Sequence, residues 1–349
     1  MELDGKKAGR KTRRSGAARS QRPSISMVAA KAGVSIATVS RIVNGVPNRA
    51  SPETMARVRD VVEELGFRPA NVGRALRTNQ NRAVALIAAN MANPAMAAVA
   101  ASVENALRET GYVMILCDSH DRADLQDEYL LEMRAHMVRG FILLGAVNSP
   151  VLDTFRETGE TLLFVNRQDP SSARGSFVGI DNVAAALEVA DFFIARSILD
   201  PVVIHGPLGS SATHDRVAAF VSSMAGANNG TPPPIFSGEG IDHLEIGRAG
   251  GRYALERSGG SVRGLFCLSD LIAYGAARAL RESGLAVPGA CSIVGFDDNP
   301  LNDWVAPWLS SVRVPYDSFG KTIVEALQGI WNGDQSATTI LPHRLVLRS

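Results

Sequence analysis

The sequence predicts an α/β protein with a small all-α head and a two-lobed body of parallel, doubly wound sheets. Capped helical segments around a glycine turn occupy residues 24–67, which indicates a helical head. Short apolar runs alternate with helical stretches from residue 83 onward, which is typical of parallel α/β folds. The 349 residues, 46% of them hydrophobic, are enough for two or three cores.

The charge is divided unequally along the chain. Residues 1–78 hold 16 Lys and Arg against 6 Asp and Glu, a net +10, whereas the remaining 271 hold 20 against 29, a net −9. A basic end suits binding to a polyanion, because each cation placed at a phosphate releases condensed counterions. The run GKKAGRKTRRSGAARSQR lacks large apolar side chains, so residues 1–23 are expected to form a disordered basic tail.

Composition argues against several other classes of protein. No apolar run approaches the roughly 18 residues needed to span a bilayer, and no apolar segment follows the basic N-terminus, so a cytoplasmic location is expected. Cys117, Cys267 and Cys291 lie far apart and lack metal-ligand spacing, which suits buried thiols in a reducing compartment. Neither a metal nor a cofactor is expected.

Three short helices are expected in residues 24–67. Ser24 can cap the first helix, which Gly33 ends, and Ser35 can cap the second. A third helix opens at Ser51, which precedes a proline suited to the first helical position. Apolar side chains recur at helical spacing in all three helices, so they can enclose a small core.

The second of these helices has a row of residues that face outward. Ile36, Ala37, Ser40 and Arg41 lie near its N-terminal end or along its outer face. In a helix-turn-helix element these positions meet base edges in the major groove. A helical hairpin without this role needs the same caps and turn, so the pattern alone leaves both interpretations open.

The chain from residue 83 is expected to form two lobes, each with a parallel sheet. Ligands of such folds bind beyond the carboxyl ends of the strands, here in the cleft between the lobes. The apolar runs expected to be strands are Val84 to Ala88, Val113 to Cys117, Phe141 to Leu144, Leu162 to Val165, Val202 to His205, Leu265 to Leu268 and Ser292 to Phe296.

Three segments in this order, VAAKAGVSIATVSRIVNG, ELGFRPANVGRALRT and VPGACSIVGFDDNP, resemble the lactose repressor (LacI/GalR) family of bacterial transcription regulators. The resemblance covers almost everything after residue 23 and implies a periplasmic-binding-protein-like sensor behind a helix-turn-helix DNA-binding head. It implies crossovers between the lobes near Phe177 to Ile180, near Val312 to Tyr316 and before RLVLRS. The implied boundaries are 1–23 for the tail, 24–67 for the DNA-binding domain, 68–82 for the hinge and 83–349 for the effector-binding and dimerisation domain. Within this last domain, the N-lobe is expected at about 83–178 plus 314–340 and the C-lobe at about 179–313 plus 341–349.

The resemblance also implies a hinge helix that folds when two copies pair over the operator and insert a leucine into the minor groove. Leu76 occupies that position, and Asn71 can cap the helix after Pro69. Gly73 stands where the family usually has alanine, which costs about 1 kcal/mol of helix stability. A plain flexible linker is the alternative. The expected DNA-binding residues are Ser24, Ser26, Ser35, Ile36, Ala37, Thr38, Ser40, Arg41, Asn44, Asn71 and Leu76.

Polar residues at strand ends are the expected effector contacts. Arg216 and Asp297 match positions that contact effector across the family, and a guanidinium suits forked bonding with hydroxyls or a carboxylate. An aromatic platform is missing after Asn93, where many relatives have Pro-Phe-Phe, so stacking on a sugar is poorly provided unless His243 supplies it. The expected contacts are Asn90, Asn93, Asp118, Asn166, Arg167, Arg216, Ser269, Asp270 and Asp297, with His120 and Asp298 as further candidates.

The expected function is that of a sequence-specific DNA-binding regulator, a repressor, whose operator affinity is modulated by a small polar effector such as a sugar or sugar acid. A homodimer is expected because a pseudo-palindromic operator needs two heads. A solute-binding receptor and an α/β enzyme are the alternatives. The first lacks a DNA-binding head, and against the second the loop GPLGSS lacks phosphate-binding motifs while no GxSxG or HExxH occurs.

Overall fold

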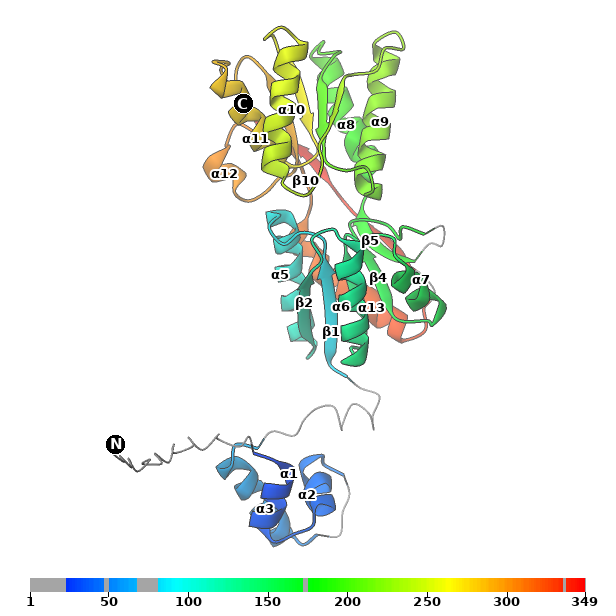
Figure 1. The fold of residues 1–349 in the computed structure, drawn as a ribbon, viewed down its shortest axis with the longest axis vertical. Helices are drawn as coiled ribbons and strands as arrows, with labels where there is room; N and C mark the ends of the chain where they lie inside the picture. The colour runs from blue at the N-terminus through cyan, green and yellow to red at the C-terminus, as the bar shows by residue number, and fades with distance from the viewer. Residues whose placement is uncertain (1–22, 47–49, 68–80, 172–174, 335–336, 349) are drawn as a thin grey trace, which may run out of the picture. The chain divides into compact units, whose positions relative to one another are not determined.

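The computed structural model describes residues 23–46, 50–67, 81–171, 175–334 and 337–348. The chain separates into two compact units, one ending at Gln80 and the other starting at Asn81. They are called the head and the body below, and each is described by itself (Figure 1). The expectations for the basic tail and for Pro69, Asn71, Gly73 and Leu76 lie outside the described residues.

The head contains three helices, α1 (Ile25–Ala32), α2 (Ile36–Val43) and α3 (Pro52–Glu64). The three predicted serine caps are confirmed, since the hydroxyls of Ser24, Ser35 and Ser51 each accept a hydrogen bond from the amide three residues later. Gly33 ends α1 in the left-handed region at φ 68°, where a side chain would be strained. These caps satisfy amides that the helices leave unpaired at their N-termini.

The three helices pack around a small apolar core. Its buried members come from all three helices, so the short helices stabilise one another by packing and none has to be stable in isolation. Lys31 on α1 also pairs with Glu64 at the end of α3. The buried core residues are Val28, Ala29, Ala32, Val39, Ile42, Val58 and Val61.

The body contains two six-stranded sheets. All seven predicted apolar runs lie in strands, to within one residue at each end. The first sheet has the order β11-β5-β4-β3-β1-β2 and is parallel throughout; its strands are β1 (Ala83–Ala88), β2 (Val113–Asp118), β3 (Phe141–Leu144), β4 (Leu162–Val165), β5 (Ser176–Ile180) and β11 (Thr338–Leu341). The second has the order β12-β10-β9-β8-β6-β7, and only β12 pairs antiparallel; its strands are β6 (Val202–His205), β7 (Ile235–Ser237), β8 (Gly264–Cys267), β9 (Ser292–Asp297), β10 (Ser310–Arg313) and β12 (Arg344–Val346).

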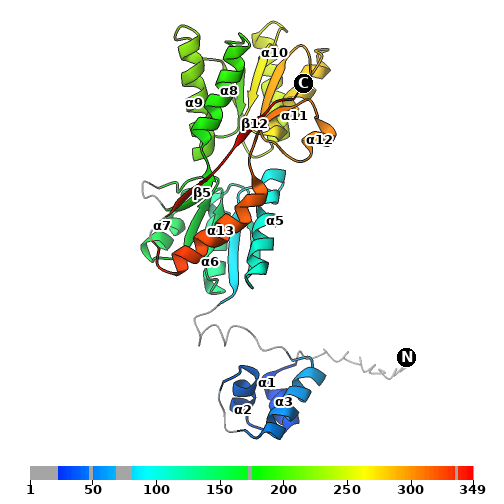
Figure 2. The same ribbon diagram turned by 180° about the vertical axis from the view of Figure 1, so that it is seen from behind.

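Helices cover both faces of each sheet (Figures 1 and 2). Alternate residues of β1 show this division, because Val84 and Leu86 pack toward one layer of helices and Ala85 and Ile87 toward the other. In the first lobe, one face of the sheet is covered by α5 (Pro94–Glu109) and α13 (Tyr316–Trp331), and the other by α6 (Ala123–Ala135) and α7 (Pro150–Glu157). In the second lobe, one face is covered by α8 (Asn182–Ala195) and α9 (Ser211–Ala227), and the other by α10 (His243–Arg257) and α11 (Asp270–Glu282), with the short α12 (Asn302–Val305) beside them.

The first crossover lies next to the expected segment Phe177 to Ile180. This segment belongs to strand β5, which is buried between β4 and β11 of the first sheet, and the chain passes to the second lobe directly after Ile180. Val312 likewise lies in β10 of the second sheet. The chain therefore passes between the lobes after Ile180, after Arg313 and between β11 and β12.

Two glycines let α10 and α11 pack closely. A Cβ on Gly247 would lie 2.0 Å from the carbonyl oxygen of Ile272, and one on Gly275 would lie 2.0 Å from that of Leu244. Only glycine permits this approach of the two backbones. The close packing brings together the N-terminal ends of the two helices, where His243 and Ser269 lie.

Candidate functional site

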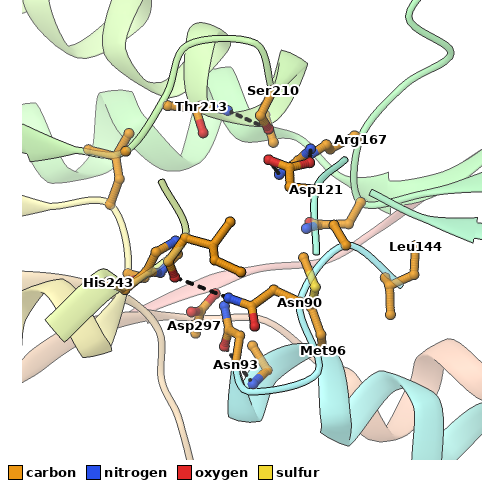
Figure 3. Close-up of a pocket in the computed structure, with 18 of the residues that line it drawn as sticks. Asn90, Asn93, Met96, Asp121, Leu144, Arg167, Ser210, Thr213, His243 and Asp297 are labelled. Atoms are coloured by element: carbon orange, nitrogen blue, oxygen red, sulfur yellow. Dashed lines mark hydrogen bonds and ion pairs between the residues drawn. The ribbon is translucent and has the colours of Figure 1, made fainter. Parts of the chain in front are cut away.

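A pocket of about 90 Å³ lies between the two lobes of the body, at the carboxyl ends of the strands (Figure 3). Side chains from both lobes line it, and polar groups alternate with apolar ones such as Met96, Leu144 and Ile272. Seven of the nine expected effector contacts line this pocket, which is called the cleft below: Asn90, Asn93, Asn166, Arg167, Arg216, Ser269 and Asp297.

The first lobe supplies amides and one ion pair. Asn93 caps α5 by accepting a hydrogen bond from the amide of Ala95 at 2.9 Å, and this fixes its side chain at the cleft. Asn90 donates from Nδ2 to the carbonyl oxygen of Ile241 in the second lobe at 3.2 Å. Both terminal nitrogens of Arg167 donate to the carboxylate of Asp121. The two lobes are thus already in contact across the cleft.

The second lobe places the buried guanidinium of Arg216 at the cleft. Its Nε donates to Asn182 Oδ1 at 2.8 Å and its Nη1 to the carbonyl oxygen of Leu268 at 3.3 Å. The guanidinium also lies 3.4 Å from the centre of the Phe296 ring. Burial lowers the pKa of Arg216 to about 10, and the charge of Asp297 opposes this shift. The group therefore remains a cation at neutral pH.

Asp297 ends β9 with a backbone φ of 112°, a conformation that few residues other than glycine adopt. Its Oδ1 accepts a hydrogen bond from the hydroxyl of Tyr316 at 2.7 Å. Burial raises the pKa of Asp297 to about 6, and the neighbouring Arg216 acts in the opposite direction. Asp297 is thus mostly ionised at pH 7 and keeps one carboxylate oxygen beyond the one that Tyr316 uses.

His243 and Ser269 complete this side of the cleft. Ser269 caps α11 by accepting from the amide of Ile272 at 3.3 Å, and its hydroxyl lies 2.9 Å from His243 Nδ1. Burial, together with the charge of Arg167, lowers the pKa of His243. The imidazole is therefore neutral at pH 7.

Asp118 and Asp270 do not line the cleft, contrary to expectation. Asp118 accepts hydrogen bonds from the amides of Met91 and His120, so it holds the loops after β1 and β2. Asp270 lies in the core of the second lobe. The rule that ligands bind beyond strand ends selects chain positions, and it does not say which way each side chain points.

Asp270 instead holds the loop that follows β9. Its carboxylate accepts from the amide of Asn299 at 2.7 Å, from Nδ2 of Asn302 at 2.9 Å and from the hydroxyl of Ser311 at 2.6 Å. Burial raises the pKa of Asp270 to about 8, and the charge of Asp297 adds to the shift. Asp298 also turns away from the cleft, since its carboxylate pairs with Arg313 and Arg348.

Sequence reasoning missed several residues of the cleft. Asp121 follows the candidate His120 directly, so extending the second strand-end loop by one residue would have found it. Tyr316 begins α13 just after a crossover. The crossover that was expected near Val312 to Tyr316 could have indicated this residue as a cleft candidate. Ser210 and Thr213, at the start of α9, also line the cleft. His243 had been considered only for stacking.

The outer face of α2 is open in the head. Ile36 is 51% exposed, and Ala37 and Arg41 are exposed as well. Several of the other expected DNA contacts form hydrogen bonds within the head. The hydroxyls of Ser24 and Ser26 lie 2.8 Å apart, and so do those of Ser35 and Thr38. Nδ2 of Asn44 donates to the carbonyl oxygen of Ser40 at 2.6 Å, which closes the end of α2.

Two surveys of the described part of the chain bear on other classes of function. The described residues contain no group of three or more His, Cys, Asp or Glu placed to hold a metal ion. Among the described helices, none is by itself long and apolar enough to cross a membrane; α1 and α2 pass that test only as a pair bent by 106°, by length and composition alone.

The fold and the cleft together define a two-lobed ligand-binding body attached to a helix-turn-helix head. Residues 24–70 match the model of the bacterial regulatory proteins of the lacI family, and residues 190–349 match that of the periplasmic binding protein-like domain. The chain belongs to the lacI family of bacterial regulatory proteins. It is a DNA-binding transcriptional regulator, which confirms what the resemblance implied.

Similar proteins span the whole architecture. The HTH-type transcriptional repressor PurR of Proteus mirabilis (strain HI4320) is 31% identical over 92% of this chain and 94% of its own, and the HTH-type transcriptional regulator CelR of Thermobifida fusca is 30% identical over 95% and 97%. A solved CelR–cellobiose complex has a TM-score of 0.69 at 27% identity, covering 94% of this chain and 99% of that chain. The Lac repressor dimer bound to operator and the anti-inducer ONPF has a TM-score of 0.77 at 22% identity, covering 94% and 98%.

Proposed function

We propose that this regulator is a cytoplasmic repressor that binds a pseudo-palindromic operator as a homodimer and changes its operator affinity when a small polar effector binds in the cleft. The observation that carries the proposal is the cleft itself, which has polar side chains from two lobes that contact each other across it. Asn90 bonds to Ile241, and the amide of Gln168 donates to the hydroxyl of Ser211 at 2.9 Å.

The exposed face of α2 is the part of the head proposed to read base edges. Arg41 suits two hydrogen bonds to a guanine, and Ile36 and Ala37 suit contact with a thymine methyl group. The serine and threonine hydroxyls of the two helix ends suit phosphate oxygens, which fix the position of the head on the duplex. Asn71 and Leu76 are proposed to act in the hinge, as the resemblance implies.

Effector binding is proposed to alter the separation of the lobes. A ligand that bonds to Asn90 and Arg167 of the first lobe and to Arg216 and Asp297 of the second stabilises one separation over others. Domain closure around a ligand at such crossovers is a common switching transition. Coupling free energies in allosteric proteins are about 1 to 3 kcal/mol, so the effector changes operator occupancy by a moderate factor.

One side of the body suits a second copy of the chain. β2 is the outermost strand of its sheet, and Val113 and Leu116 on it are 64% and 44% exposed. Trp304 and Val305 of α12 are 84% and 61% exposed on the same side of the body (Figure 1). An open edge strand and exposed large apolar side chains are normally covered. A homodimer that covers them supplies the two heads that a palindrome needs.

The experiment is selection of binding sequences from a pool of random duplexes with the full-length protein. The proposal predicts recovery of a palindromic sequence whose affinity falls steeply with added salt, because phosphate contacts release counterions. Equal retention of all sequences would contradict it. Recovering the bound effector unchanged, by mass spectrometry after prolonged incubation, separates this function from that of an enzyme on the same scaffold.

A further inference from the structure

The contact between Asp297 and Tyr316 joins the two lobes of the body. Asp297 ends β9 of the second lobe, whereas Tyr316 begins α13 of the first lobe, and their side chains are bonded at 2.7 Å. Burial raises the pKa of Tyr316 well above its ordinary value, so its hydroxyl keeps its proton and donates it to the bond. A change in the separation of the lobes therefore acts directly on the first turn of α13.

α13 is one continuous helix that runs obliquely across the first lobe, away from the second lobe (Figure 2). Its 16 residues, Tyr316–Trp331, span roughly 24 Å at 1.5 Å per residue. Near its start, Ser102 Oγ of α5 donates to the carbonyl oxygen of Asp317 and accepts from the amide of Gly320, both at 2.9 Å. A Cβ on Gly320 would lie 2.0 Å from the carbonyl oxygen of Ser102, so only glycine allows this approach. The close contact makes α5 and α13 one rigid pair.

The last residue of α13 belongs to a group of three side chains, Tyr112, Arg139 and Trp331, which is called the entry cluster below. The centres of the Tyr112 and Trp331 rings lie 4.9 Å apart. The guanidinium carbon of Arg139 lies 4.2 Å from the centre of the Trp331 ring and 5.4 Å from that of the Tyr112 ring. Trp331 Nε1 donates to the carbonyl oxygen of Arg139 at 3.1 Å, and the guanidinium of Arg139 donates to the hydroxyl of Tyr112. The end of α13 is therefore fixed to the residues that precede β2 and β3.

The residues before β2 and β3 also hold the start of the body. The carbonyl oxygen of Arg82 accepts a hydrogen bond from the amide of Val113 at 2.7 Å. The carbonyl oxygen of Ala83 accepts one from the amide of Arg139, also at 2.7 Å. β1 lies between β2 and β3 in the sheet, so its first residues have partners on both sides. The chain enters the body at this point, directly after the unit that ends at Gln80 and contains the head.

We propose that α13 is a lever that transmits the state of the cleft to the point where the chain enters the body, with Tyr316 at one end and the entry cluster at the other. A changed bond at Tyr316 displaces α13, and the displacement reaches the start of β1 through Arg139. The members of the entry cluster are positioning residues, because none of them lines the cleft or belongs to the head. The inference rests on the proposed function in taking operator affinity as the property that the cleft controls.

The first test is hydrogen exchange of the full-length protein, read by mass spectrometry, without operator or effector. Tyr316→Phe removes the bond to Asp297 and keeps the ring. The amides of Val113 and Arg139, which hold the start of β1, should exchange about threefold faster or more in this variant, because one hydrogen bond that steadies α13 is lost.

Tyr274→Phe is the matched control for this measurement. It also removes the hydrogen bond of a tyrosine hydroxyl, here to Asn302 Oδ1 at 2.6 Å, but the bond lies within the second lobe. Exchange at Val113 and Arg139 should stay at the rate of the parent. Equal rates at these two amides in Tyr316→Phe and Tyr274→Phe overturn the proposal.

The second test is a double-mutant cycle on operator affinity, with the duplex that the selection experiment recovers as the probe. Tyr316→Phe alone should change operator affinity by about threefold or more, which one lost hydrogen bond can supply. The change should disappear in an Arg139→Leu background, although substitutions separated by the length of α13 usually act independently. Additive effects overturn the proposal, and so does an unchanged operator affinity of Tyr316→Phe.

Two further variants keep the cycle decisive. Trp331→Phe removes only the bond to the carbonyl oxygen of Arg139 and replaces Arg139→Leu in the cycle if the latter does not fold. Arg196→Leu is the control, because its guanidinium lies 3.8 Å from the centre of the Phe192 ring in the second lobe. In the Arg196→Leu background the effect of Tyr316→Phe should persist in full.

The two tests separate this inference from the proposed function. A protein that selects a palindrome but shows additive substitutions and unchanged exchange overturns the lever and leaves the regulator function standing. A protein whose exchange responds to Tyr316→Phe alone, but which prefers no duplex sequence, supports the lever within the body and overturns the proposed function.

Discussion

The head and the body differ in the size of their apolar cores. Among the described residues, the buried core of the head has seven members, none larger than isoleucine. The body buries phenylalanines on both faces of its first sheet, among them Phe155 on α7 and Phe319 on α13. A small core gives a domain little stability, whereas a large core can hold both the strained Asp297 and the buried Asp270.

This difference teaches where each function resides. The head presents its functional residues on an open helix face, where only the caps and a few apolar contacts are needed to position them. The body keeps its functional residues in a cleft and holds them with hydrogen bonds from a rigid surround, as Asn182 holds Arg216. The two parts should therefore respond differently to damage.

The largest expected effect is loss of the head on substitution of its core. Val39 is fully buried, and Val39→Asp places a carboxylate there at a cost of about 3 kcal/mol or more. Operator binding should disappear, while the thermal transition of the body and its ligand affinity stay unchanged. Calorimetric scanning with a DNA-binding assay measures both. A shift in the melting of the body would contradict the independence of the two parts.

A structural role in the body is expected for Asp270. Asp270→Ala removes the acceptor of the Asn299 amide and of the Ser311 hydroxyl, and one of the two acceptors of Asn302 Nδ2, which should cost about 2 to 3 kcal/mol of unfolding free energy. Urea denaturation measures it. Asp297→Asn is the comparison, since it should reduce ligand affinity with a smaller loss of stability. A larger loss of stability in Asp297→Asn than in Asp270→Ala would contradict the structural role given to Asp270.

The dimer face can be tested with one aspartate. Trp304→Asp should weaken self-association by at least tenfold, because an exposed tryptophan at an interface is a common energetic anchor. Ile235→Asp, on the exposed outer strand β7, is the control and should leave the dimer intact. Sedimentation velocity across a concentration series distinguishes them. If both variants stay dimeric, the second copy binds elsewhere.

Arg41 is expected to contribute to the recognition of a single base pair in each half-site of the operator. Arg41→Ala should cost about 1 to 3 kcal/mol of discrimination at one base pair of each half-site. Binding to operators already altered at that base pair should change little. A panel of single-base operator variants measures this pattern. Uniform weakening across the panel would assign Arg41 to a phosphate.

The last prediction concerns pH. The folded pKa of Asp270 is raised to about 8 from an ordinary value of 3.8, so its contribution to stability is present below pH 4 and is lost as the pH rises toward 8. Unfolding free energy of the body should fall across this window, by at most about 1.4 kcal/mol per pH unit. Asp270→Asn should flatten the profile. A parent profile with no decline would show that Asp270 is ionised throughout.

Much of this architecture could be predicted from the sequence, and the exceptions have physical reasons. Helix caps and buried apolar runs are local signals, so Ser35 and the strand Phe141–Leu144 were found directly. The crossover near Ile180 was expected from the family resemblance alone, because the buried strand Ser176–Ile180 that precedes it carries no local signal of a crossover. The direction of a strand-end side chain depends on distant partners, such as Asn299 for Asp270, and no local pattern reports it.

The central claim is that the cleft ligand and the operator bind to one coupled protein. The most direct test first finds a ligand of the cleft, the probe, by a thermal-shift screen of small polar metabolites. It then measures operator affinity with and without saturating probe, and probe affinity with and without operator. The account predicts that both affinities change by the same factor, between about 5 and 150, because coupling between sites is reciprocal. Equal operator affinity with and without the bound probe would contradict it.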